Sequence, residues 1–191
     1  MARDRATRPE AKPLRLFVAV EVPGDVRSVV ADAIEPFRAR YPKARWVPAE
    51  NQHVTVKFLG RTWPRLVEWV KEGIGEVARV HASFETRVEG VGAFPSARRA
   101  RVLWAGLDDA GSRFVAIAGA LDEALAGAFV PEPRAFTPHL TVARFDPAVW
   151  LDEPPLIRSE PFAVDRLVLF ESHLRRPAPV YEPLGAFPLS G

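Results

Sequence analysis

The stretch that decides the fold is "HVTVKFLG", residues 53–60. Its polar and apolar side chains alternate, which is typical of a strand with one buried face. His53, Thr55 and Lys57 are predicted to share one face of this strand. The opposite face is predicted to anchor the strand against helices, and it carries Val54, Val56 and Phe58.

A second stretch, "HLTVARF" at residues 139–145, repeats the pattern His-x-Thr-Val. His139 and Thr141 are predicted to share one face, with Leu140 and Val142 on the other. The chain has only four histidines, so two of them in the same setting call for an explanation. A single short pattern carries a high risk of coincidence, whereas two copies on equivalent strands indicate a common site.

Strand and helix patterns surround both motifs. β-branched residues, alternation and bounding Pro or Gly predict further strands at 14–23, 44–48, 83–94, 100–107, 162–172 and 180–187. Helices are predicted to begin near Asp25, at Thr62 with Pro64, and near Phe114. Their apolar stripes are Val26, Val29, Val30, Ala33, Ile34 and Phe37; Leu66, Val67, Val70, Ile74 and Val77; and Phe114, Val115, Ala118, Leu121 and Leu125.

This order of elements predicts the α+β class. The two halves of the chain each contain strands, helices and one His-x-Thr strand. We expect two similar lobes, each an antiparallel sheet with helices packed outside, and the two sheets facing each other across a central groove. Residues 1–12 are expected to form a flexible tail, and residues 13–191 a single bilobal domain.

Composition excludes several classes of function. The chain contains no cysteine, which removes thiol nucleophiles and cysteine metal sites and fits the cytoplasmic location that we expect. No apolar run approaches the roughly 18 residues of a membrane span, and the N-terminus has no signal-peptide core, so no membrane association is expected. The net charge of +2 argues against a protein that coats long nucleic acids, but it permits a local basic groove.

Two imidazoles and two hydroxyls that meet in a groove suit the chemistry of a phosphodiester. Histidine has a pKa of about 6.5, so one ring can be neutral and accept a proton from water while the other is protonated and donates to the leaving oxygen. Threonine hydroxyls can hydrogen-bond the non-bridging oxygens, where negative charge develops. This chemistry requires no metal, and the sequence contains no metal-ligand spacing such as HExxH. We therefore expect no cofactor.

The chain resembles the two-histidine phosphoesterases, specifically the RNA 2′,3′-cyclic phosphodiesterases, which are also called 2′-5′ RNA ligases. The resemblance extends from Arg15 to about Gly185. It rests on "RLFVAVEVP", "HVTVKFLG", "FPSARRARVLWAGL", "FTPHLTVAR" and "LVLFES", and above all on the paired His-x-Thr motifs.

This resemblance implies metal-independent hydrolysis of a 2′,3′-cyclic phosphate at an RNA end to a 2′-phosphomonoester. It implies that His53 is the proton donor, that His139 is the acceptor, and that Thr55 and Thr141 bind the phosphate. The residues themselves leave the order of the two histidines open, because both motifs are nearly the same. Two alternatives also stay open: an ATP-independent 2′-5′ RNA ligase that joins cleaved RNA halves with the same groups, and a non-catalytic nucleotide-binding module. We expect the protein to act as a monomer.

Two further residues are candidates for substrate binding. Arg144 follows His139 by five residues, where similar proteins also carry arginine, and its guanidinium could hold the phosphate. Strict alternation places it on the face opposite His139 unless the strand ends or bulges. Phe17 is predicted on the more polar face of its strand, where it could stack on a nucleobase or belong to the core.

Other basic residues are weaker candidates. The loop cluster of Arg98, Arg99 and Arg101 could meet an RNA backbone, but a solvated basic loop is the simpler interpretation. His81 is predicted at a helix end, where it complements the helix dipole. His173 lies near a strand end and lacks a threonine two residues on.

Overall fold

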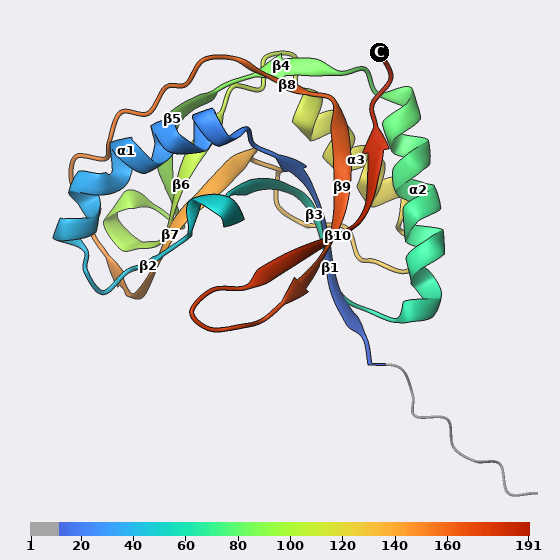
Figure 1. Cartoon of the computed structure of the whole chain (residues 1–191), viewed down its shortest axis with the longest axis horizontal. Helices are drawn as coiled ribbons and strands as arrows, with labels where there is room; N and C mark the ends of the chain where they lie inside the picture. Colours follow the sequence, from blue (N-terminus) through green and yellow to red (C-terminus); the bar gives the residue numbers. More distant parts are fainter. Residues whose placement is uncertain (1–11) are drawn as a thin grey trace, which may run out of the picture.

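The structure of the protein is a computed structural model, which describes residues 12–191 (Figure 1). The predicted tail, residues 1–12, lies outside this part of the chain except for Lys12. In chain order the elements are β1 (Leu14–Glu21), α1 (Gly24–Arg40), β2 (Arg45–Trp46), the 3₁₀ helix η1 (Ala49–Asn51), β3 (His53–Thr62), η2 (Pro64–Leu66), α2 (Val67–Val80), β4 (Phe84–Thr86), β5 (Val88–Phe94), η3 (Ala97–Arg99), β6 (Ala100–Leu107), α3 (Arg113–Ala124), β7 (His139–Val149), β8 (Phe162–Val164), β9 (Arg166–His173) and β10 (Val180–Pro188).

The strands form two lobes that are joined at the motif strands. The main sheet has the order β10-β9-β1-β3-β7-β6-β5, with β2 beside β7, and all these neighbours pair antiparallel. β3 and β7 are connected by a single residue pair, Val54 with Leu140. The sheet is therefore almost divided there into a first lobe (β10, β9, β1, β3) and a second lobe (β7, β6, β5, β2). This confirms the predicted α+β class with two antiparallel lobes.

The lobes do not coincide with the two halves of the sequence. β9 and β10 return from the end of the chain to the first lobe, where β9 pairs with β1. Helices α2 and α3 contact each other and the strands of the first lobe. By contrast, the end of α1 reaches the second lobe, where the Arg38 guanidinium lies over the Trp46 ring and Tyr41 meets Phe145 edge-on. Periodicity predicted the helices, but it does not specify which sheet each helix covers.

The buried residues form one hydrophobic cluster with members from both lobes. The predicted helix stripes supply much of it, including Val30, Ile34, Ile74, Phe114 and Leu121. Val29 and Val115 are exceptions to the prediction, because their side chains are 39% and 44% exposed. Both lie at the margin of a helix face whose buried part is narrower than the predicted stripe.

Element boundaries differ from the prediction at two places. Thr62 does not begin a helix: it is a buried residue at the end of β3, and Pro64 opens a 3₁₀ turn before α2 starts at Val67. The predicted strand 83–94 is interrupted at Arg87.

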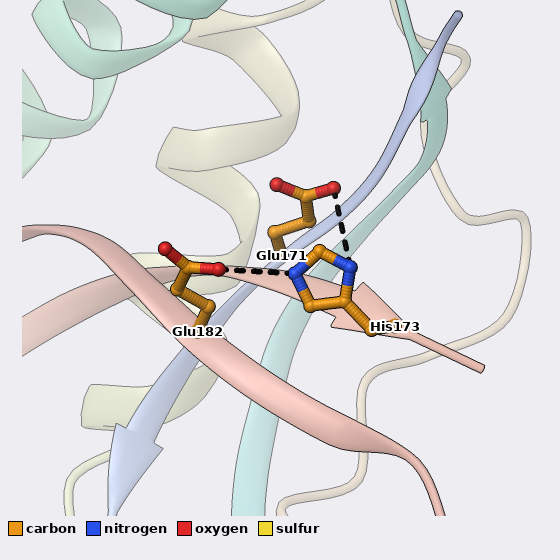
Figure 2. Close-up of side chains that lie close together, drawn as sticks. All are labelled: Glu171, His173 and Glu182. Atoms are coloured by element: carbon orange, nitrogen blue, oxygen red, sulfur yellow. Dashed lines mark hydrogen bonds and ion pairs between the residues drawn. The ribbon is translucent and has the colours of Figure 1, made fainter. Parts of the chain in front are cut away.

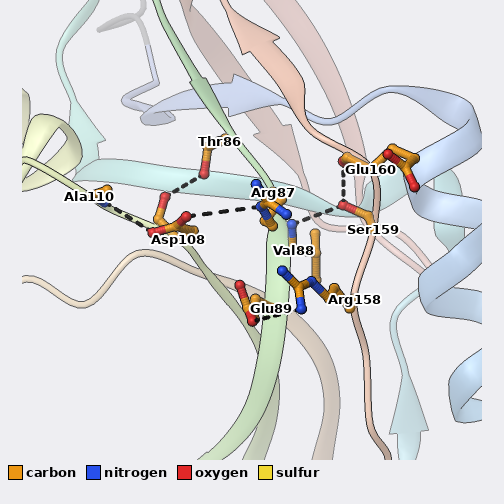
Figure 3. Close-up of polar contacts among 9 residues, drawn as sticks. All are labelled: Thr86, Arg87, Val88, Glu89, Asp108, Ala110, Arg158, Ser159 and Glu160. Carbon is orange, nitrogen blue, oxygen red and sulfur yellow. Dashed lines mark hydrogen bonds and ion pairs between the residues drawn. The ribbon is translucent and has the colours of Figure 1, made fainter.

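The interruption at Arg87 is stabilised by side-chain hydrogen bonds (Figure 3). The Thr86 hydroxyl donates to the main-chain oxygen of Asp108 at 2.6 Å. The Val88 amide donates to Ser159 Oγ at 3.0 Å. Because Thr86 and Ser159 are both buried, these bonds satisfy polar groups that the broken ladder would otherwise leave unpaired.

None of the helices described for residues 12–191 is long and apolar enough to span a membrane.

Candidate active site

A groove of about 1180 Å³ lies where the two lobes meet. The side chains of His53, Thr55, His139 and Thr141 all line it, so the structure brings together the four residues of the two motifs. They flank the residue pair Val54–Leu140 that joins the lobes. The apolar residues between them are buried on the other face of the sheet, as alternation requires.

The two histidines are held in the same tautomer. Nδ1 of His53 donates to the Asn51 carbonyl at 2.8 Å, and Nδ1 of His139 donates to the Thr137 carbonyl at 2.7 Å. A carbonyl only accepts, so Nδ1 of each ring carries the proton and Nε2 carries the lone pair of the neutral form. Nε2 of His53 contacts Thr55 Oγ1 at 3.0 Å. His139 has no such bond from Nε2 within residues 12–191.

Aromatic rings fix the orientation of each imidazole. The Phe17 ring stacks on His53 with centroids 4.8 Å apart, and Tyr181 meets His53 edge-on at 5.1 Å. Phe94 meets His139 edge-on, also at 5.1 Å. Rings held in this way lose little freedom when substrate binds, which is a requirement of precise proton transfer.

Phe17 lies on the groove face of β1, as predicted, but it is only 3% exposed. Its ring is stacked on His53 and on Phe170. Little of the ring is left for a nucleobase, so the geometry favours a residue that positions His53 over one that stacks on substrate.

Burial lowers the pKa of both histidines. The pKa of His53 falls to about 4 because burial disfavours the charged ring; the bond to the Asn51 carbonyl opposes this effect, and charge on His139 adds to it. The pKa of His139 is also lowered, first by burial and then by the charge of Arg144, against the effect of the Thr137 carbonyl. In the ligand-free protein both rings are therefore neutral near pH 7.

Each motif strand carries a β-bulge directly after its threonine. Along β3, Thr55 pairs with Ala19 and Lys57 with Val18, so Val56 is the extra residue. Along β7, Thr141 pairs with Trp104 and Ala143 with Leu103, so Val142 is the extra residue. A bulge places two consecutive residues opposite one, and the side chains that follow exchange faces.

The bulge in β3 overturns two predictions from strict alternation. Lys57 does not share the face of His53: it is 5% exposed and its ammonium pairs with the carboxylate of Asp122 on α3. Phe58 does not anchor the strand against the helices. Its ring is 53% exposed and lines the groove, where the Arg15 guanidinium lies 4.7 Å from the ring centroid.

The bulge in β7 turns Arg144 into the groove, on the side of His139. Strict alternation would place Arg144 on the face opposite His139, and the bulge reverses that placement. Its charge contributes to lowering the pKa of His139 and opposes the burial that raises the pKa of Tyr181. Phe58 and Arg144 hold equivalent positions, five residues after the histidine of each motif.

Several groove residues were missed at the sequence level. They are Asn51, Tyr181, and the arginines Arg15, Arg45, Arg175 and Arg176. Arg15 shares the alternating face of Phe17, which would have predicted it in the groove. The adjacent arginines Arg175 and Arg176 stand beside prolines, which would have predicted a basic loop. Arg98, Arg99 and Arg101 are exposed and do not line the groove, and Arg101 faces Asp146 at 3.6 Å.

The remaining histidines lie outside the groove. Nδ1 of His81 donates to the Val77 carbonyl at the end of α2, at 2.8 Å. His173 lies between Glu171 and Glu182 across the β9–β10 pair (Figure 2). The potential ligand atoms of these three lie within 4.8 Å of one another, and they form the one group of that kind among the described residues. Ser172 lines the groove, so alternation places Glu171 and His173 on the opposite face of β9.

Comparison with known proteins identifies relatives of this arrangement. A family model described as the 2′-5′ RNA ligase superfamily matches residues 26–176. The RNA 2′,3′-cyclic phosphodiesterase of Thermus thermophilus is 33% identical over 93% of this chain and 91% of its own length. The protein of that name from Geobacillus stearothermophilus is 28% identical, but the chain spans only 57% of its length. Among solved structures, E. coli LigT complexed with 3′-AMP superposes with a TM-score of 0.78 at 27% identity, covering 94% of this chain and 100% of that one.

Proposed function

Because the chain belongs to the 2′-5′ RNA ligase superfamily, we propose that it hydrolyses 2′,3′-cyclic phosphates at RNA ends to 2′-phosphomonoesters. The observation that carries this proposal is the matched pair of imidazoles. His53 and His139 each bond a main-chain carbonyl through Nδ1 and line one groove. Two Nε2 atoms are thereby left to accept and donate protons, as hydrolysis of a phosphodiester requires. The proposal assigns every catalytic group to a single chain and includes action as a monomer.

The proposed reaction uses one proton acceptor and one proton donor. His139 Nε2 removes a proton from water while the water oxygen attacks phosphorus. The P–O3′ bond breaks, and Nε2–H of His53 gives its proton to O3′, so the product carries a 2′-phosphate and a free 3′-hydroxyl. The bond from Nδ1 to a carbonyl stabilises positive charge on each ring as it forms.

The Thr55 hydroxyl contacts the ring atom that the proposal makes the proton donor. While His53 is neutral, the Thr55 hydroxyl donates to its Nε2. When the anionic substrate raises the pKa of His53 and the ring is protonated, Nε2 no longer accepts from the hydroxyl, and its N–H can turn to the leaving O3′. The hydroxyl hydrogen is then free to bond a non-bridging phosphate oxygen. Thr141 is assigned the same task from the other lobe.

The test is hydrolysis of a nucleoside 2′,3′-cyclic phosphate by single histidine variants. His53→Ala and His139→Ala are each expected to lower kcat by roughly 10²–10⁴-fold, because each removes one proton transfer. His81→Ala, a histidine outside the groove, is the matched control and should retain wild-type activity. Wild-type turnover by either groove variant would exclude the mechanism. Binding of a 2′-nucleotide without any turnover by the wild type would instead favour a non-catalytic binding module.

The roles of the two histidines can be separated with an activated substrate. In a nucleoside 2′-(p-nitrophenyl phosphate), nitrophenolate leaves without needing a proton, so loss of the acid should matter much less than loss of the base. We expect this substrate to rescue His53→Ala and not His139→Ala. Rescue of the other variant would reverse the assignment.

The joining of RNA ends through a 2′-5′ bond, which is the same displacement on the cyclic phosphate with a different nucleophile, is a second candidate. It is favoured by the extension of the groove on both sides of the motifs, toward Phe58 on β3 and toward Arg144 on β7. A ribose 5′-hydroxyl would then replace water. Incubation of cleaved RNA halves, followed by separation of joined from hydrolysed products, measures the balance of the two reactions.

A further inference from the structure

We propose that Arg175 and Arg176 form a second phosphate subsite, which binds the phosphate on the 5′ side of the reacting nucleotide. The inference rests on the proposed function and names its substrate more closely. The preferred substrate is an RNA end of at least two nucleotides rather than a cyclic mononucleotide.

The charge of the groove greatly exceeds what one phosphate needs. Its lining residues within the described chain include five arginines and no carboxylate, although the whole protein has a net charge of only +2. The arginines are Arg15, Arg45, Arg144, Arg175 and Arg176. Like charges gathered in one groove repel each other and are stabilised by a polyanion.

Among residues 12–191, none of these five arginines has a carboxylate counterion, in contrast to some of the arginines outside the groove. Arg101, Arg158 and Arg166 each lie within 4.0 Å of a carboxylate oxygen. For residues 12–191, no ion pair is formed by any of the five groove arginines. Their guanidinium groups are therefore available to bind phosphates, often with two parallel hydrogen bonds.

Four of the five arginines can be assigned to different parts of the groove. Arg144 lies near the reacting centre: β7 carries it into the groove on the side of His139, whose pKa its charge lowers. Arg15 is placed over the Phe58 ring. Arg175 and Arg176 belong to the loop 174–179 between β9 and β10, which extends from the sheet in Figure 1. They line the same groove as the two histidines.

The loop that carries this pair is attached to the catalytic centre at its far end. The side-chain amide of Asn51 donates to the Pro179 carbonyl at 2.8 Å. Two residues further on, Tyr181 meets the ring of His53. A strand of RNA whose terminal phosphate reaches His53 and His139 therefore passes the loop, where its next phosphate can meet Arg175 and Arg176.

The test compares kcat/KM for adenosine 2′,3′-cyclic phosphate with that for the dinucleotide ApA ending in the same cyclic phosphate. We expect the wild type to prefer the dinucleotide by roughly 10-fold or more, the usual effect of a hydrogen bond between charged groups. In Arg175→Ala/Arg176→Ala the ratio should fall to about one. In Arg98→Ala/Arg99→Ala, an exposed arginine pair outside the groove, the ratio should stay at the wild-type value.

A third substrate isolates the charge. A methylphosphonate in place of the internal phosphate of ApA removes its negative charge and keeps both bases, so the preference should disappear in the wild type. The subsite is overturned if the preference survives this replacement, if it survives the double arginine variant, or if the wild type shows no preference. Failure of the proposed function looks different, since neither substrate would then be hydrolysed.

Discussion

Asn51 connects the two parts of the candidate site through one residue. Its main-chain carbonyl accepts the Nδ1 proton of His53, and its side chain donates to the Pro179 carbonyl. The tautomer of the imidazole and the position of the loop 174–179 therefore depend on the same residue. Asn51 ends a short 3₁₀ turn two residues before His53, the first residue of β3, and it lines the groove.

Replacement of Asn51 by Ala should remove the bond to the loop and leave the bond to His53 in place. We expect kcat/KM to fall by roughly fivefold, the equivalent of one neutral hydrogen bond, mainly through a higher KM. Asn51→Asp is the matched control for size, since a carboxylate cannot donate to a carbonyl and should have at least the same effect. Steady-state kinetics with both variants measure KM and kcat. An unchanged KM in both would show that the loop does not depend on this bond.

Two β-bulges decide which side chains reach the groove. The placement of His53, Thr55, His139 and Thr141 could be predicted, because period-two alternation is intact up to each threonine. The placement of Phe58 could not be predicted, because a bulge arises from pairing with a neighbouring strand. It cannot be recognised from the alternation of polar and apolar residues in its own strand. For Arg144 the same reasoning identified the bulge as the required condition without showing that it is present.

The ion pair between buried Lys57 and half-buried Asp122 fixes the bulge of β3 against α3. Lys57→Met removes the buried charge and leaves the Asp122 carboxylate, which is 26% exposed, without its partner. Because water partly solvates that carboxylate, we expect a loss of about 2 kcal/mol in the free energy of unfolding, less than for a fully buried pair. The groove should also change, since Phe58 follows Lys57 directly, and KM should rise. Chemical denaturation and steady-state kinetics measure the two effects.

The control is Lys71→Met, which breaks the exposed pair with Glu68 at 2.9 Å. This variant should lose no more than about 0.5 kcal/mol. The double variant Lys57→Met/Asp122→Leu should recover part of the lost stability, because it removes the unpaired carboxylate. Equal losses in Lys57→Met and Lys71→Met would contradict a structural role for the Lys57–Asp122 pair.

At the scale of the molecule, the site exists because two lobes meet along one residue pair. The sequence predicted two antiparallel lobes, since each motif strand is flanked by further strands and by helices with apolar stripes. It did not predict that β9 and β10 return to the first lobe or that α1 reaches the second. Those placements depend on long-range packing, which local periodicity does not encode. The result is that imidazoles from different lobes share one groove, and their titration depends on how the two lobes are arranged.

This shared burial predicts where activity is maximal on the pH scale. The reaction needs one neutral and one protonated ring, so the rate is highest between the pKa values of the pair. Both pKa values are lowered in the free protein, that of His53 to about 4, so the optimum of kcat/KM should lie below pH 6.5 rather than around neutrality. A bound phosphate anion favours protonated imidazole and raises both pKa values. The optimum of kcat, which reports the complex, should therefore lie at higher pH than that of kcat/KM. Full pH profiles of both parameters test this, and coincident optima, or an optimum of kcat/KM above pH 7, would show that burial does not control the pair.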